Sequence, residues 1–273
     1  MIGMAAVVGN YPLYFDATNE KGLSMAGLNF PENAVFFPMR KGKDNITPFE
    51  FIPWVLSQCA TVHEARQLLA RISLFDENFN AQLPLQPLHW MISDRDESIV
   101  VESVRDGLKI YENPVGVTTN NPTFDMQLFS LNNYRNVSPS SLPVTFAAGL
   151  KLDEYSRGMG GMGIPGDLSS ASRFVRAVFT KLNSICAEDE ASSVSQFFHI
   201  LGSVEQQRGC CRLGTENEIT IYSSCVNTDK GIYYYKTYDN SRINAVNMQK
   251  ENLQGNTLLT FPLRMQLDIA WQN

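Results

Sequence analysis

The sequence predicts an α+β fold built from antiparallel sheets with helices segregated onto their outer faces. Strand and helix patterns occur in successive groups along the chain, not in the one-by-one alternation of a parallel α/β fold. Short turn-like segments separate the strand patterns, as in antiparallel hairpins. The chain has 273 residues, of which 44% are hydrophobic, and this is enough to bury the core of one large domain or two small ones.

Residues 4–30 predict β structure. A short apolar run covers residues 4–8, and residues 14–16 and 23–30 flank a turn-like segment at 19–22. Gly22 ends that segment and can adopt the positive φ that tight turns often require. We therefore expect a hairpin here.

Two capping boxes predict helix starts further along the chain. Thr47 and Glu50 form the first box, with a proline at the first helical position, and Pro53 should kink the helix that follows. Thr61 and Glu64 form the second box. The apolar residues after it recur at helical spacing, namely Val62, Ala65, Leu68, Leu69 and Ile72.

The remaining residues predict further groups of strands and helices. Helices are expected at 122–134, at about 171–183 and at about 192–204. Residues 135–168 have little periodicity and many Ser, Pro and Gly residues, so we expect a long loop, which in a compact domain tends to be functional or an assembly element. Extended segments are predicted at 88–93, 98–104, 108–111, 115–118, 218–226, 231–238 and 242–248.

Composition and charge exclude several classes of partner. The formal net charge is −6, which argues against a nucleic-acid partner, because phosphates require a surface rich in Lys and Arg. No apolar run reaches the roughly 18–20 residues of a membrane-spanning helix. The first residues have no basic segment typical of a signal peptide. We expect a soluble, cytoplasmic protein with no membrane partner.

The cysteines and histidines predict no disulfide framework, metal site or cofactor. The chain has five cysteines, an odd number, and three scattered histidines. His89 lies within an apolar strand pattern and is interpreted as a packed core histidine, whereas His63 and His199 are interpreted as surface or boundary residues.

Three further motifs have simpler structural explanations. The sequence lacks the Gly-x-Ser-x-Gly elbow that would indicate a Ser-His-Asp triad. The glycine-rich run at 158–167 lacks the Gly-Lys-Ser/Thr ending of a phosphate loop, so a flexible loop is favoured. The carboxylates of Asp94, Asp96 and Glu97 lie at a predicted turn, where solvated charge is the expected role. Composition and spacing alone therefore identify no active site.

Five segments in order resemble the choloylglycine hydrolases, a branch of the N-terminal nucleophile (Ntn) hydrolases. The resemblance spans residues 1 to about 263 and implies a single domain over 1–273, folded as a four-layer αββα sandwich. It also implies a homotetramer, for which the 135–168 loop is a candidate assembly element. The five segments are residues 26–31, 87–94, 116–122, 163–167 and 172–177.

The resemblance implies a mechanism and three site residues. In this family an N-terminal cysteine attacks the amide carbonyl, and its own α-amino group acts as the base. Asn29 and Asn120 match asparagines that point donors at the oxyanion, and Arg173 matches an arginine that favours the thiolate. Taken alone, Asn29 could be a turn residue, Asn120 a helix N-cap and Arg173 a surface residue.

The family substrates are bile acids conjugated to glycine or taurine, with phenoxymethyl penicillin for a sister branch. Asn29 favours bile salts, because penicillin acylase relatives tend to have tyrosine there. Three apolar residues, Phe79, Leu83 and Leu85, are candidates for lining a steroid pocket, and core packing is an equally good interpretation.

The sequence departs from the family at its start. Met1 aligns roughly fifty residues into a typical member, a length that holds several strands of about 5–6 residues each. The nucleophilic cysteine and its neighbouring arginine and aspartate have no counterpart, so we expect the chain as written to be inactive and its fold to be incomplete at the N-terminus. Three hypotheses remain: a fragment of a bile salt hydrolase, a non-catalytic bile-acid-binding paralogue, and a remnant.

Overall fold

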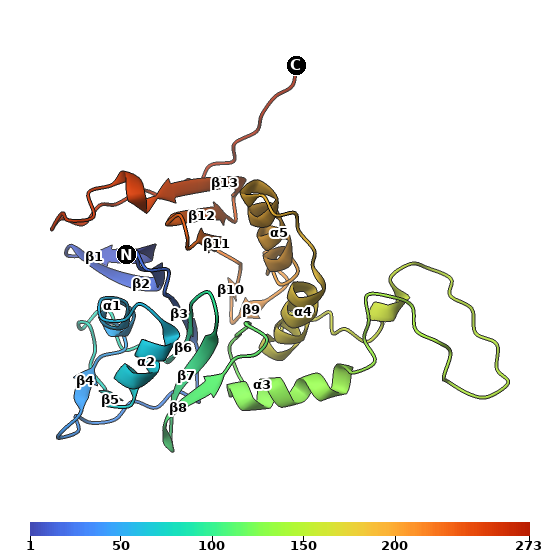
Figure 1. The fold of residues 1–273 in the computed structure, drawn as a ribbon, viewed down its shortest axis with the longest axis horizontal. Coiled ribbons are helices and arrows are strands. Elements are labelled where there is room, and N and C mark those ends of the chain that lie inside the picture. The colour runs from blue at the N-terminus through green and yellow to red at the C-terminus, as the bar shows by residue number, and fades with distance from the viewer.

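The computed structural model describes residues 1–273 and has four layers (Figure 1). A six-stranded antiparallel sheet, in the order β1-β2-β3-β6-β7-β8, is followed by a three-stranded sheet, β11-β12-β13. Helices α1 and α2 cover the outer face of the first sheet, and α4 and α5 lie beside the second. The α+β, αββα architecture expected from the sequence is thus confirmed.

Nine of the ten predicted extended segments are strands of the two sheets, in the predicted order, and residues 115–118 are the exception. The first sheet contains β1 (Ile2–Val8), β2 (Tyr11–Thr18), β3 (Ser24–Asn29), β6 (Leu88–Ser93), β7 (Ser98–Val104) and β8 (Gly107–Glu112). The second contains β11 (Tyr222–Asn227), β12 (Ile232–Thr237) and β13 (Asn240–Asn247). The helices are α1 (Phe51–Leu56), α2 (Val62–Leu69), α3 (Phe124–Ser130), α4 (Ser170–Asn183) and α5 (Glu190–Gly202), with short 3₁₀ turns at Leu131–Tyr134, Met159–Gly161 and Met248–Lys250.

The main core lies between α1, α2 and the first sheet. Trp90 is fully buried and meets the ring of Phe51 edge-on, with 4.9 Å between the ring centroids. Side chains of β6 alternate between the two sheet faces, so Trp90 and Ile92 join this core while His89 faces the opposite side. A smaller cluster on that opposite side packs Val100 against Phe124 of α3 and Phe174 of α4.

The two sheets are joined face to face by apolar and polar contacts. Met4 of β1 packs on Tyr233 and Tyr235 of β12. Asp16 of β2 accepts hydrogen bonds from the hydroxyls of Tyr222 and Tyr233, each 2.7 Å long. These phenol–carboxylate bonds connect the sheets across more than 200 residues of sequence.

The threonine of the second predicted capping box caps its helix, although the Glu64 carboxylate accepts from the N–H of Ala60 and not from that of Thr61; the first box does not form. Thr61 caps α2 by accepting from the backbone N–H of Glu64, 3.2 Å away. In the first box the Thr47 hydroxyl donates to the Glu50 carboxylate at 2.8 Å, and residues 48–50 form a turn before α1 begins at Phe51. Pro53 therefore lies in the first turn of a six-residue helix, where its missing N–H costs little.

Two other details differ from the prediction. Residues 115–118 form no strand, because the side chains of Asn113 and Lys181 take the carbonyls of Val117 and Val115 at 3.2 and 2.8 Å. Four strands of two or three residues were not predicted, since none is long enough to show a period. They are β4 (Asp44–Ile46), β5 (Ile72–Leu74), β9 (Arg212–Leu213) and β10 (Glu216–Asn217).

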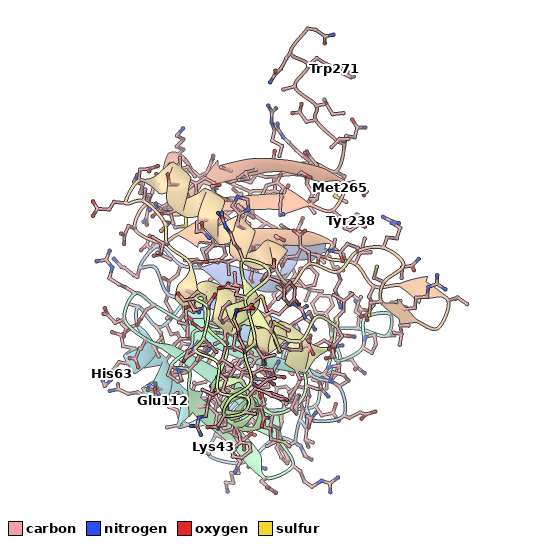
Figure 2. The ribbon with its side chains drawn as sticks, turned by 90° about the vertical axis from the view of Figure 1, so that its right-hand side faces the viewer. Lys43, His63, Glu112, Tyr238, Met265 and Trp271 are labelled. Atoms are coloured by element: carbon pink, nitrogen blue, oxygen red, sulfur yellow. The ribbon has the colours of Figure 1, made fainter.

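The 135–168 segment is the long loop that the sequence predicts. It contains one 3₁₀ turn and extends away from the four layers (Figure 1). Its apolar side chains include Phe146 and Tyr155, which are 81% and 82% exposed. The C-terminal residues also leave the body, with Trp271 near their end (Figure 2). None of the helices has the length and apolarity that crossing a membrane requires.

Asp94 at the β6–β7 turn makes more contacts than a solvated turn charge. One carboxylate oxygen accepts from the N–H of Val62 at the start of α2, at 2.8 Å, and the other accepts from the N–H groups of Asp96 and Glu97. Partial burial raises the pKa of Asp94, but the backbone donors lower it by more, so the pKa lies below its ordinary value. The carboxylate therefore links the turn to the helix.

We predict that Asp94→Asn lowers the free energy of unfolding at pH 7 by about 1 kcal/mol, the usual effect of losing a helix-cap acceptor. Because the folded pKa is lowered, the advantage of the wild type is present above the unfolded pKa of about 3.9 and is lost as pH falls through the folded pKa. Urea unfolding at pH 7 and below pH 4 tests this, with exposed Asp96→Asn as the control. Equal stability of Asp94→Asn and wild type at pH 7 would contradict it.

Candidate active site

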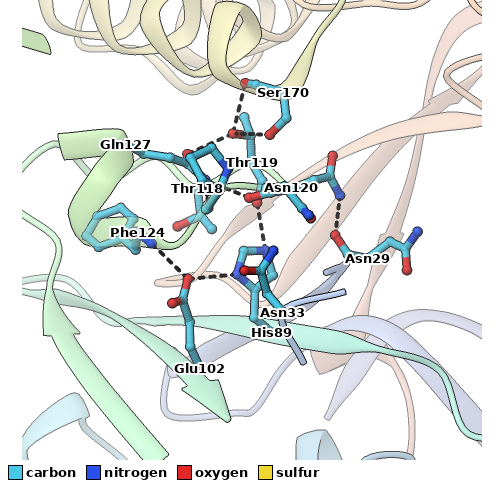
Figure 3. Close-up of polar contacts among 12 residues, drawn as sticks. Asn29, Asn33, His89, Glu102, Thr118, Thr119, Asn120, Phe124, Gln127 and Ser170 are labelled. Carbon is cyan, nitrogen blue, oxygen red and sulfur yellow. Dashed lines mark hydrogen bonds and ion pairs between the residues drawn. The ribbon is translucent and has the colours of Figure 1, made fainter. Parts of the chain in front are cut away.

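Asn29, Asn120 and Arg173 come together in space although they are far apart in sequence (Figure 3 shows the two asparagines). The Asn120 carboxamide nitrogen donates to the backbone carbonyl of Asn29 at 2.7 Å. The Asn120 carboxamide oxygen accepts from an Arg173 guanidinium nitrogen, also at 2.7 Å. The three residues therefore form one connected polar group at the end of β3.

Asn29 is positioned by the sheet and keeps its own carboxamide free. It is the last residue of β3 and pairs with Leu88 of β6. Its side chain is exposed, makes no hydrogen bond to protein and points away from Asn120 (Figure 3). Both of its N–H donors are available to a ligand.

Arg173 lies in the first turn of α4 and is half-buried. Ser169 caps this helix, and the Asp167 carboxylate accepts from the Ser169 N–H at 3.0 Å and the Ser172 hydroxyl at 2.5 Å. The Arg173 Nε donates to the carbonyl of Leu168 at 3.1 Å, which fixes the guanidinium plane. Burial, followed by the nearby charge of Arg176, lowers the pKa of Arg173, yet a guanidinium remains charged near neutrality.

Asn120 is held through its backbone by α3. It is not a helix N-cap, because α3 begins at Phe124 after Thr123. The buried Gln127 side chain donates to the carbonyls of Asn120 and Pro122, at 2.6 and 2.8 Å. The loop before α3 is thus fixed by a side chain of the helix that follows it.

Two buried residues near Asn120 were not predicted to belong to the site. His89 and Glu102 are both fully buried, and His89 Nδ1 lies 3.1 Å from Glu102 Oε1 (Figure 3). His89 Nε2 donates to the carbonyl of Thr119 at 2.7 Å. His89 is a packed core histidine, as predicted, but it contacts the site loop. The signal in the sequence was Glu102, a carboxylate that directly follows the apolar run Ile99–Val101 of β7.

The three apolar residues predicted to line a steroid pocket form a separate group. Phe79 packs on Tyr11 and Phe49, with ring centroids 5.6 and 5.2 Å apart. Leu83 is exposed and Leu85 is half-buried. No hydrogen bond or ring contact joins them to the polar group, so their pocket role stays a prediction.

Two cavities beside the C-terminal residues lie away from the polar group. One of about 720 Å³ lies between β1, β2 and residues 251–263, and another of about 490 Å³ lies between β13 and the C-terminal residues. Neither is lined by Asn29, Asn120, Arg173 or the predicted pocket residues.

Three of the five cysteines, Cys59, Cys211 and Cys225, have surroundings that disfavour the thiolate. Cys59 and Cys225 are buried, and burial raises the pKa of each thiol, to about 12 for Cys225. Cys211 lies near Arg173, but its hydrogen bond to the Glu218 carboxylate raises its pKa, which disfavours the thiolate.

Nearly the whole chain matches one known protein family. Residues 1–261 match the linear amide C–N hydrolases of the choloylglycine hydrolase family. This chain belongs to the choloylglycine hydrolase family. Membership confirms the resemblance seen in the sequence and makes this family member an amide hydrolase by class.

Curated relatives of this choloylglycine hydrolase family member share extensive sequence. A bile salt hydrolase/transferase of Lactiplantibacillus plantarum is 58% identical over 267 residues, which are 97% of this chain and 82% of that protein. A bile salt hydrolase/transferase of Clostridium perfringens is 39% identical over 279 residues, which cover all of this chain and 84% of that one.

Solved structures agree with the fold of this family member. A cysteine-to-alanine mutant of conjugated bile acid hydrolase from Clostridium perfringens superposes with a TM-score of 0.92 at 39% identity, covering 99% of this chain and 83% of that one. Penicillin V acylase from Agrobacterium tumefaciens reaches a TM-score of 0.64 at 22% identity, over 87% and 67% of the two chains. The second likeness concerns the fold alone.

Proposed function

We propose that these residues carry the oxyanion-binding half of a bile salt hydrolase, which cleaves the amide bond of bile acids conjugated to glycine or taurine. The observation that carries the proposal is the Asn29–Asn120–Arg173 group. In it the Asn29 carboxamide and the second N–H of Asn120 remain free to donate to a developing oxyanion. Relatives named as bile salt hydrolases, up to 58% identical, support this substrate class.

Each residue has a distinct role in the proposed reaction. A cysteine sulfur attacks the amide carbonyl, and the carbonyl oxygen gains negative charge as the tetrahedral intermediate forms. Asn29 and Asn120 stabilise that charge, while the Arg173 cation orients the Asn120 carboxamide and favours a nearby thiolate. Glycine or taurine leaves with a proton, and water releases the bile acid from the sulfur.

The attacking group in the proposed reaction is a cysteine at a mature N-terminus. Each of the five cysteines in the 273 residues is internal, so none has a free α-amine to act as its base. We therefore propose that these 273 residues alone release no glycine or taurine.

An assay of two proteins tests the proposed function. One is the 273-residue chain, and the other is an extended chain that carries the in-frame segment encoded upstream of Met1 and begins with cysteine. We expect the extended chain to release glycine from glycocholate and taurine from taurocholate, and the 273-residue chain to release neither. No release by an extended chain with an N-terminal cysteine would refute the proposal, and so would release by the shorter chain.

Two alternatives predict different results in the same experiment. A penicillin V acylase would cleave phenoxymethyl penicillin with kcat/KM at least about tenfold above that for glycocholate. A non-catalytic paralogue or a remnant would show no upstream cysteine-encoding frame, and only the paralogue would bind glycocholate. Asn29, where penicillin acylase relatives tend to have tyrosine, favours the bile salt reading.

The assembly and cellular location are also proposed from the family. We propose a homo-oligomer, tetrameric as the family resemblance implies, in the bacterial cytoplasm. The exposed apolar side chains of the 135–168 loop, including Phe146 and Tyr155, support a role in assembly because large exposed apolar surfaces mark interaction sites.

A further inference from the structure

We propose that His89 is a positioning residue that holds Asn29 and Asn120 in register with each other. His89 is the second residue of β6, is fully buried and forms no hydrogen bond with either asparagine side chain. It contacts a sequence neighbour of each asparagine, Phe30 after Asn29 and Thr119 before Asn120. The proposal rests on the proposed function in that the two asparagines are taken as oxyanion donors.

On one side, His89 fixes the loop that carries Asn120. A carbonyl oxygen has no proton to give, so His89 Nε2 must carry the hydrogen that it shares with the Thr119 carbonyl, 2.7 Å away. The Asn120 carbonyl on the next peptide is held by Gln127 at 2.6 Å. The two carbonyls that flank the Asn120 α-carbon are thus both fixed by buried side chains, which aims its carboxamide.

On the other side, His89 fixes the residue after Asn29. The imidazole stacks on the ring of Phe30, with 4.1 Å between the centroids and 2° between the planes. Phe30 is itself fully buried and directly follows the last residue of β3. A single ring therefore contacts the neighbours of both oxyanion donors.

Glu102 holds the imidazole in this orientation. The ladder pairs Trp90 with Val101, so His89 and Glu102 are the next cross-strand neighbours, on the opposite face from that pair. Glu102 Oε1 lies 3.1 Å from His89 Nδ1 and also accepts from the Phe124 N–H at 3.0 Å, which ties the pair to α3. The Glu102 carboxylate and the Thr119 carbonyl contact opposite nitrogens of the ring, and together they fix the orientation of the imidazole.

Burying a polar pair such as His89 and Glu102 removes both groups from water, and this often contributes little to stability. A network of this kind beside a site is therefore better explained by the geometry that it imposes. Exposed ion pairs of this chain, such as Arg95 with Asp229, remain in water and position no site residue.

Two substitutions separate the positioning role from simple packing. His89→Gln places an amide nitrogen near the position of Nε2 and keeps the donor to Thr119, whereas His89→Asn places one near Nδ1 and loses it. The readout is hydrogen exchange of the Asn120 carboxamide in the 273-residue chain, measured by NMR against the exposed Asn252 carboxamide. We expect His89→Asn to speed exchange at Asn120 by about tenfold and His89→Gln by less than about threefold, as the loss or retention of one buried hydrogen bond requires.

Unchanged exchange at Asn120 in His89→Asn would overturn the proposal. Equal acceleration in both variants would also overturn it, because it would assign His89 to packing alone. Should the variants fail to fold, nitrogen spectra of wild type give a second test, since the chain has only three histidines. His89 Nε2 must appear protonated and slow to exchange; an unprotonated Nε2 refutes the proposal. None of these measurements depends on hydrolysis, so a failed activity assay and a failed positioning role are distinguishable.

Discussion

Asn120→Ala lowers kcat for glycocholate by about 10²–10³ in the extended chain, while KM changes much less, as expected for removal of one oxyanion donor. The alanine removes the N–H that would meet the developing charge. It also leaves the half-buried Arg173 guanidinium without its 2.7 Å acceptor. The effect therefore falls on the transition state more than on substrate binding.

The matched control for this substitution is Asn132→Ala. Asn132 is exposed in the 3₁₀ turn that follows α3, and its side chain donates to the carbonyl of Phe129. Steady-state kinetics of both variants, with unfolding curves to show intact folds, decide the matter. If Asn120→Ala retains wild-type kcat, Asn120 is not an oxyanion donor and the proposed chemistry of the site is wrong.

Asp16→Ala lowers the free energy of unfolding by about 3 kcal/mol, since each buried hydroxyl left without a partner costs about 1–3 kcal/mol. The hydroxyls concerned are those of Tyr222 and Tyr233, which donate to Asp16 across the interface between the sheets. Their loss loosens the packing of one sheet on the other. Urea unfolding at pH 7 measures the effect, and exposed Asp229→Ala is the control.

Asp16→Asn separates the hydrogen bonds from the charge. The amide oxygen accepts from one phenol and the amide nitrogen donates to the other, so we expect most of the stability to remain. Burial raises the pKa of Asp16 even though the two tyrosines lower it. A raised folded pKa means that stability is present below the unfolded value of about 3.9 and is lost as pH rises through the folded pKa. The stability difference should therefore move in favour of Asp16→Asn as pH rises, and a shift the other way would contradict this.

Elements with a strong local signal were predictable from the sequence. Thr61 and the apolar period after it gave α2, and the turn at Asp94 gave the β6–β7 hairpin. Strands and helices whose presence or bounds depend on side chains distant in sequence were not predictable. The 115–118 segment has a strand-like sequence, but Lys181 of α4 takes one of its carbonyls and keeps it out of the sheet.

The site residues, too, were predictable only in part from the sequence. Asn29, Asn120 and Arg173 were selected through family resemblance, because an asparagine or arginine in isolation is typical of turns, caps and surfaces. The structure brings them into contact, but their catalytic roles remain proposals for the kinetics to test. The apolar pocket assigned to Phe79, Leu83 and Leu85 remains a prediction as well.

The class of fold, the grouping of strands and helices, and the family could be inferred from the amino-acid sequence, because local periodicity and ordered segments record them directly. Three-dimensional packing was needed to show that His89 and Glu102 face each other near the Asn120 loop, and that Asp16 joins the two sheets. These contacts join residues from different strands and helices. Which partners meet there depends on sheet register and layer packing, which no local pattern encodes.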